Sequence, residues 1–249
     1  MMCKIKLVIY IFLFSHLVFT QNNDPLLSED IEKQSVWVDS IYNAMTLDEK
    51  IGQLFFVQAN SFESNNSEKI KNLIRNQKIG GLIFSKGTPN NQIMLTKSFQ
   101  KISEVPLLIS MDAEWGLSMR LDSVPKFPWN MSLGSISNNN LIKKVGKTIG
   151  EQCNTIGVHL NFSPVVDINT NPKNPIIGNR SFGESKENVA NKAISYMNGL
   201  QSKNILSTAK HFPGHGDTSK DSHKTLPIIK HKRKRILKTE VYPYKKLIE

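Results

Sequence analysis

The chain has 249 residues, of which 39% are hydrophobic and 21% are charged, and its formal net charge is +11. This composition excludes a disordered polypeptide, and the length permits one large domain or two small ones. Part of the basic excess lies in the run at residues 230–235, which could attract an anionic polymer. A solvated helix face explains the run better, because no aromatic residues are interleaved with it, and we expect no nucleic-acid partner.

The first residues have the pattern of a secretory signal peptide. Lys4 and Lys6 precede an almost wholly apolar stretch at 7–19, which is too short to span a membrane comfortably. We predict a signal peptide at 1–20, a polar segment at 21–35, and export to the periplasm or the extracellular space. An uncleaved anchor is the alternative, and this segment is the only membrane contact we expect. Cys153 would then be the single cysteine of the mature chain, and we expect it to be an inert core residue.

Short apolar runs then alternate with segments of helical periodicity. The first helix is predicted at 31–45, and a capping pattern at 46–49 opens a short second helix. Five runs are typical of strands, at 54–57, 81–84, 106–110, 158–162 and 205–209. The helices predicted between and after them lie at 67–77, 90–102, 140–156, 187–202 and 232–249.

Successive strand–helix units predict an α/β fold with a parallel sheet. Because the chain lacks a Gly-rich dinucleotide fingerprint, a (β/α)₈ barrel of the TIM type is favoured over a doubly wound sheet. Such a barrel needs eight strands, and the sequence supplies about five. We therefore expect a barrel domain at 36–249 that is incomplete at its C-terminal side.

Polar residues follow three of the predicted strands, where barrel enzymes place their functional groups. The segments are MDAEWG at 111–116, SPVVD at 163–167 with GNRSFG at 178–183, and KHFPGHGDTSKDSH at 210–223. His211 and His215 have the spacing of a zinc-binding helix, but Pro213 and Gly214 between them make a helix implausible. The glutamate of a zinc-binding HExxH motif is also missing, so we expect neither a metal nor another cofactor.

Asp221 and His223 are two residues apart in a Gly-rich loop. In an extended segment this spacing places both side chains on the same side. A carboxylate beside an imidazole orients it and favours its protonated form, which suits a proton donor. The alternative is a simple Asp–His hydrogen bond that fixes the loop.

Taken together, these segments resemble family 3 glycoside hydrolases, specifically the bacterial β-N-acetylglucosaminidase (β-N-acetylhexosaminidase) branch. The closest resemblance lies in KHFPGHGDTSKDSH followed by Leu226-Pro227, and DAEWG, FSPVVDIN and GNRSFG occur in the family's order and spacing. The resemblance covers residues 36–249. It implies a (β/α)₈ catalytic domain that binds an N-acetylhexosamine-containing oligosaccharide and hydrolyses it with retention, through a covalent glycosyl-enzyme.

The resemblance also implies roles for individual residues. His223 would be the catalytic acid/base, Asp221 would tune it, and Asp112 would grip sugar hydroxyls. Asp167 would be structural, and Trp115 would wall the sugar pocket. The remaining members of the expected sugar cradle are Arg120, Arg180, Lys210 and His211.

One family feature is missing. The nucleophile of the family is an aspartate on a later strand, whereas only Glu240 and Glu249 follow His223, both in a helical pattern on the outer ring. Retaining chemistry needs its two catalytic groups about 5–5.5 Å apart, so we predict that the 249-residue chain lacks glycosidase activity.

Three functions remain open from the sequence. The first is hydrolytic release of β-linked N-acetylglucosamine, most plausibly from peptidoglycan fragments. The second is sugar binding without catalysis. The third is phosphorolysis, because histidine repels an incoming phosphate less than glutamate would.

Overall fold

The computed structural model describes residues 30–62, 64–221 and 223–249. The predicted signal peptide at 1–20 and most of the polar segment at 21–35 lie outside the described residues. Within the described part of the chain, no helix combines the length and the apolar character needed to cross a bilayer.

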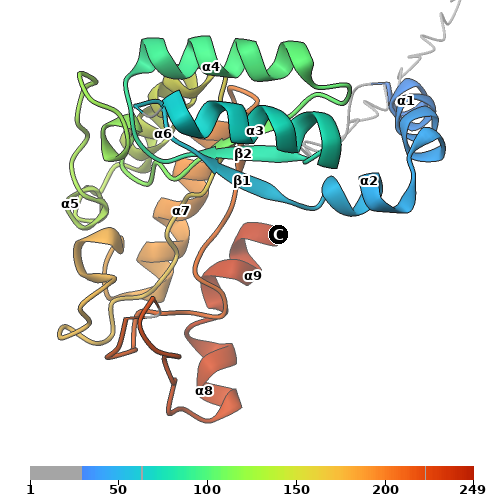
Figure 1. The fold of residues 1–249 in the computed structure, drawn as a ribbon. Coiled ribbons are helices and arrows are strands. Elements are labelled where there is room, and N and C mark those ends of the chain that lie inside the picture. Colours follow the sequence, from blue (N-terminus) through green and yellow to red (C-terminus); the bar gives the residue numbers. More distant parts are fainter. Residues whose placement is uncertain (1–29, 63, 222) are drawn as a thin grey trace, which may run out of the picture.

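Five parallel strands form one sheet (Figure 1). They are β1 (Phe56–Ala59), β2 (Gly81–Phe84), β3 (Leu108–Met111), β4 (Leu160–Asn161) and β5 (Leu206–Ser207). Their order in the sheet is their order in the chain, and every neighbouring pair is parallel. A doubly wound sheet would reverse its strand order at one point, so the prediction of a barrel-type α/β fold is confirmed. Over the described residues the barrel is not closed.

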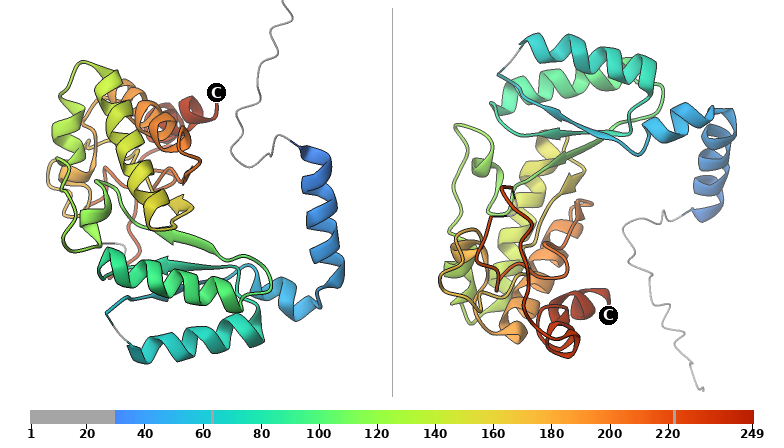
Figure 2. Two further views of the ribbon diagram at one scale, coloured as in Figure 1. Left: turned by 90° about the horizontal axis from the view of Figure 1, so that it is seen from above. Right: turned by 60° about the horizontal axis from the view of Figure 1, so that its bottom comes forward.

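Helices connect the strands and flank the sheet. They are α1 (Ile31–Ala44), α2 (Leu47–Gly52), α3 (Ser64–Gln77), α4 (Pro89–Ile102), α5 (Asn130–Gly134), α6 (Asn139–Thr155), α7 (Lys186–Gln201), α8 (Arg233–Lys238) and α9 (Tyr242–Ile248), with 3₁₀ turns η1 (Leu117–Met119) and η2 (Gly178–Arg180). Figure 2 shows α1 standing away from the sheet, and this helix buries none of its residues. The α2 helix begins with the predicted capping box, in which Thr46 and Glu49 satisfy each other's backbone amides.

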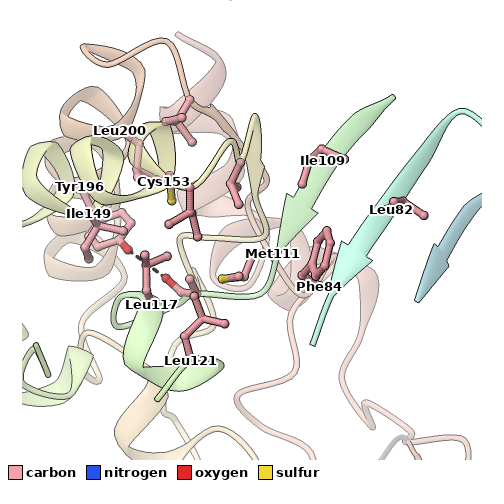
Figure 3. Close-up of a cluster of buried hydrophobic side chains, with 14 of the residues drawn as sticks. Leu82, Phe84, Ile109, Met111, Leu117, Leu121, Ile149, Cys153, Tyr196 and Leu200 are labelled. Atoms are coloured by element: carbon pink, nitrogen blue, oxygen red, sulfur yellow. Dashed lines mark hydrogen bonds between the residues drawn. The ribbon is translucent and has the colours of Figure 1, made fainter. Parts of the chain in front are cut away.

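The core lies between the strands and the paired helices α6 and α7 (Figure 3). Phe84 on β2 and Met111 on β3 are fully buried, as are Ile149 on α6 and Tyr196 on α7. Cys153 on α6 is fully buried, and burial raises the pKa of its thiol to about 12. A thiol that stays protonated is unreactive, which confirms the prediction of an inert core cysteine.

Several predicted elements differ from the structure in their bounds. The strands predicted at 106–110, 158–162 and 205–209 are β3 at 108–111, β4 at 160–161 and β5 at 206–207. The first strand begins two residues later than predicted, because Leu54 and Phe55 continue the turn that ends α2 through bonds to the carbonyls of Ile51 and Gly52. The predicted helix at 232–249 is two helices, α8 and α9. Pro243 lies in the first turn of α9, where a backbone amide hydrogen would have no partner in the helix, so its absence costs nothing. In the interior of one continuous helix the same proline would remove a backbone hydrogen bond and break the helix.

The break between α8 and α9 also corrects the expectation for Glu240. This residue does not lie on an outer helix face: it is 4% exposed, sits between the two helices and pairs with Arg235. Gly214 packs directly against it, since a Cβ at Gly214 would lie 2.7 Å from the Cβ of Glu240. The backbone of Gly214 has a φ of +140°, a region that glycine tolerates best.

Candidate functional site

Charged side chains meet at the carboxyl ends of β3, β4 and β5. Parallel strands end at one edge of a sheet, so residues that follow different strands become neighbours there. A bridge between Val165 and Lys210 extends the pairing beyond β4 and β5 and places the segment at 210–211 beside the loop after β4. We call the resulting group of ionisable side chains the ionic cluster. Its members are Asp112, Glu114, Arg120, Asp167, Arg180, Lys210 and His211.

Asp112 lies between two cations. One carboxylate oxygen accepts a hydrogen bond from Arg120 Nη2 at 2.6 Å, and the other pairs with the ammonium of Lys210. Burial alone would raise the pKa of Asp112, but the Lys210 ammonium and the Arg120 guanidinium outweigh it and hold that pKa below its usual value. Asp112 therefore stays ionised, and its side chain is 29% exposed, so a ligand can reach it.

Glu114 joins the other two cations and is the member that the sequence analysis missed. Its side chain is fully buried, and it accepts two hydrogen bonds from Arg180, from Nε at 2.9 Å and from Nη2 at 2.7 Å. Lys210 Nζ lies 2.7 Å from the same carboxylate. The sequence did hold a signal for this role. The predicted sugar cradle places three cationic side chains around one carboxylate, Asp112, which leaves two positive charges that need a further acidic partner.

His211 lies between Asp167 and Arg180, which fixes its tautomer. Its Nδ1 is 2.6 Å from Asp167 Oδ2, and its Nε2 is 3.0 Å from Arg180 Nη2. A guanidinium can only donate, so Nε2 must accept and the proton must sit on Nδ1. Besides His211, the cluster contains three carboxylates, Asp112, Glu114 and Asp167, and three cationic side chains, Arg120, Arg180 and Lys210.

Asp167 is an anchor for the loop after β5. It is buried, and it accepts hydrogen bonds from the backbone amides of His211 and His215 as well as from the His211 ring. This arrangement supports the structural role predicted for it. The His215 ring contacts Thr218 instead, so the two histidines have separate partners, and neither lies on a helix.

The predicted dyad forms, but apart from the ionic cluster. His223 Nδ1 and the His223 amide nitrogen each lie 2.9 Å from Asp221 Oδ1. The hydrogen bond from the His223 amide, followed by that from the ring, lowers the pKa of Asp221. The His223 side chain is 84% exposed. Among the described residues, no hydrogen bond or ion pair connects the dyad to the ionic cluster.

The cluster can bind a neutral polyhydroxylated ligand. Asp112 supplies acceptor oxygens, while Lys210, Arg120 and Arg180 supply donors, and all four side chains are partly exposed. A sugar hydroxyl is both donor and acceptor, so adjacent acceptor and donor groups match it. The five predicted cradle residues, from Asp112 to His211, are thus brought together, and His223 is not.

The stability that Asp112 contributes is expected to be lost in acid. Because its folded pKa lies below the ordinary value of 3.8, the unfolded chain takes up this proton first as the pH falls. The contribution of Asp112 to the unfolding free energy is therefore fully present above the ordinary pKa of 3.8 and is lost as the pH falls through the lower pKa of the folded state. We expect urea unfolding to show a smaller loss of unfolding free energy for Asp112→Asn than for the wild type between about pH 5 and pH 3. Equal losses would contradict the ion pairs described here.

Comparison with known families gives a match over most of the chain. Residues 46–249 match the family model described as the glycosyl hydrolase family 3 N-terminal domain. A β-hexosaminidase A of Pseudoalteromonas piscicida is 34% identical over an alignment of 194 residues, which covers 73% of this chain and 32% of that protein. A β-hexosaminidase of Nitrosomonas eutropha is 31% identical over 69% of this chain and 52% of its own length. The chain thus spans about a third to a half of these relatives.

Solved structures are similar over the same region. A family 3 β-N-acetylglucosaminidase from Paenibacillus sp. str. FPU-7 is 37% identical, with a TM-score of 0.76 over 82% of this chain and 40% of that chain. A β-glucoside phosphorylase has a TM-score of 0.82 over 87% of this chain and 39% of that chain, at 24% identity. The second similarity shows the shared fold alone.

Proposed function

Because the chain belongs to glycosyl hydrolase family 3, we propose that it binds a terminal β-linked N-acetylglucosamine for hydrolysis. The observation that carries the proposal is the ionic cluster at the strand ends. Its carboxylate and its three cations are already paired and oriented, so binding a sugar costs little further ordering. The relatives named as β-hexosaminidase and β-N-acetylglucosaminidase support N-acetylhexosamine as the sugar.

In the proposed reaction, Asp112 accepts hydrogen bonds from sugar hydroxyls, and Lys210, Arg180 and Arg120 donate to others. His223, held by Asp221, protonates the glycosidic oxygen and later removes a proton from the attacking water. Since the His223 segment does not contact the cluster, this step requires the segment to move onto the bound sugar. Loop closure of this kind is common in enzymes that bind and then enclose a substrate.

The nucleophile is proposed to come from outside these residues. Beyond His223 the only carboxylates are Glu240 and Glu249. Glu240 is buried against Arg235, and Glu249 at the end of α9 pairs with Lys246 at 2.5 Å. Among the described residues, neither has a hydrogen bond or ion pair to the ionic cluster, so we propose that retaining hydrolysis uses another acid.

We also propose that the protein is exported and acts on peptidoglycan fragments. The charge and apolar stretch at 1–19 support export. Peptidoglycan contains β-linked N-acetylglucosamine outside the cytoplasm, so the two proposals agree.

The test is an assay of the full gene product with an aryl β-N-acetylglucosaminide, with and without phosphate. We expect free N-acetylglucosamine at a rate that phosphate does not change. Accumulation of the sugar 1-phosphate would instead indicate a phosphorylase, and binding without any turnover would indicate a sugar-binding relative.

A further inference from the structure

A hollow lined by two tryptophans lies in the long loop between β3 and α6. It has a volume of about 300 Å³, and its lining includes Trp115, Trp129, Phe127 and Lys126. The two indole rings are tilted against each other with centroids 4.3 Å apart. Trp129 is 46% exposed, which is unusual for so large an apolar side chain with an aromatic neighbour.

Residues that line the hollow are chain neighbours of residues in the ionic cluster. Trp115 follows Glu114 in the chain, and Met119, another lining residue, precedes Arg120. A further connection comes from Asn130, the residue after Trp129, whose side-chain amide donates to the carbonyl of Arg180 at 2.9 Å. Two chain connections and one hydrogen bond therefore place the hollow near the groups that are proposed to hold the sugar.

The wall of the hollow is rigid. Phe127 packs over Gly116, where a Cβ would lie 2.7 Å from the phenyl ring. Ser118 also lines the hollow, and its hydroxyl oxygen is buried without a hydrogen-bond partner among the described residues.

These properties fit a pyranose ring. Such a ring has apolar C–H faces and polar hydroxyls around its edge, so it packs on an aromatic face while its edge is hydrogen-bonded. Lys126 can donate to these hydroxyls from the rim. The ionic cluster is built from strand ends, whereas the hollow is built from the loop farther out. Because both sites are linked through the loop after β3, they can hold neighbouring units of one saccharide.

We propose that the hollow is the binding site for the sugar unit on the leaving-group side of the scissile bond, with the rings of Trp129 and Trp115 packed against that unit. This inference rests on the proposed function, because it assumes that the ionic cluster holds the terminal N-acetylglucosamine. It makes Trp129 a specificity-determining residue: a leaving group that is a sugar gains affinity there, and a leaving group without a ring does not.

Binding measurements on the full gene product test the inference without turnover. The probes are N-acetylglucosamine and its β-1,4 disaccharide with sulfur in place of the glycosidic oxygen, which resists hydrolysis. In isothermal titration calorimetry we expect the wild type to bind the disaccharide about tenfold more tightly than the monosaccharide. Trp129→Ala should abolish that difference and leave the monosaccharide affinity unchanged, while Trp129→Phe, which keeps a ring, should retain most of it.

Trp37→Ala is the matched control. Trp37 is 52% exposed on α1, at the other end of the molecule from α5 and Trp129 (Figure 1). This variant should keep the tenfold preference for the disaccharide. The inference is overturned if the wild type binds both probes equally, or if Trp129→Ala weakens both equally, because the hollow would then hold part of the terminal sugar. Failure of the wild type to bind either probe would instead refute the proposed function.

Discussion

His223→Ala is expected to lower kcat of the full gene product by about 10²–10⁴-fold on a saccharide substrate, because the leaving sugar must be protonated as its bond breaks. The side chain is 84% exposed and holds no other element in place, so its removal should leave the fold intact. Steady-state kinetics combined with a thermal melt would separate a loss of chemistry from a loss of folding.

The choice of substrate makes the His223 prediction specific. An aryl glycoside with an acidic phenol as leaving group needs little protonation, so its glycosylation step should be impaired much less. Lys220→Ala, at an exposed residue of the same loop, is the control and should behave as the wild type. An equal loss of the glycosylation rate on both substrates would contradict the role of His223 as an acid.

Glu114→Ala is expected to have the largest effect on stability. The substitution leaves the cations of Arg180 and Lys210 without their buried partner, and breaking a buried ion pair in this way costs about 3–5 kcal/mol. It should also weaken binding of N-acetylglucosamine, since both cations are proposed to contact the sugar. Urea unfolding and calorimetry would measure the two effects.

Glu104→Ala provides a matched surface control. Glu104 pairs with Lys78, but its side chain is 75% exposed, and exposed pairs contribute about 0–1 kcal/mol. Glu114→Gln should fall between these variants, because it keeps the shape and some of the hydrogen bonds. If Glu114→Ala were no more destabilising than Glu104→Ala, the cluster would not be held by Glu114.

Much of the fold could be predicted because the pattern of apolar residues follows the periodicity of each element. The strand at 81–84 lies where it was predicted, and the long helices begin and end within a few residues of their predicted bounds. The break in the predicted helix at 232–249 was missed although Pro243, in the first turn of α9, is a local signal for it. The burial of Glu240 could not be foreseen in the same way, because it depends on packing against Gly214, which is distant in the chain.

The candidate site was predicted in part. The topology places Asp112 after β3 and Lys210 after β5, at the same edge of the sheet with β4 between them, and the family resemblance indicated which side chains meet there. Glu114 was missed because a sequence does not show that two carboxylates, two residues apart, both turn into the cluster. The position of His223 relative to the cluster was equally hidden, since it depends on the conformation of a loop.

The central claim is that the ionic cluster holds the terminal sugar. A crystal structure of the full gene product with bound N-acetylglucosamine would test this most directly. We expect sugar hydroxyls within about 3 Å of the Asp112 carboxylate and the Lys210 ammonium, with the His223 segment closed over the ring. A sugar bound elsewhere, with the cluster unchanged and free of ligand, would contradict the account.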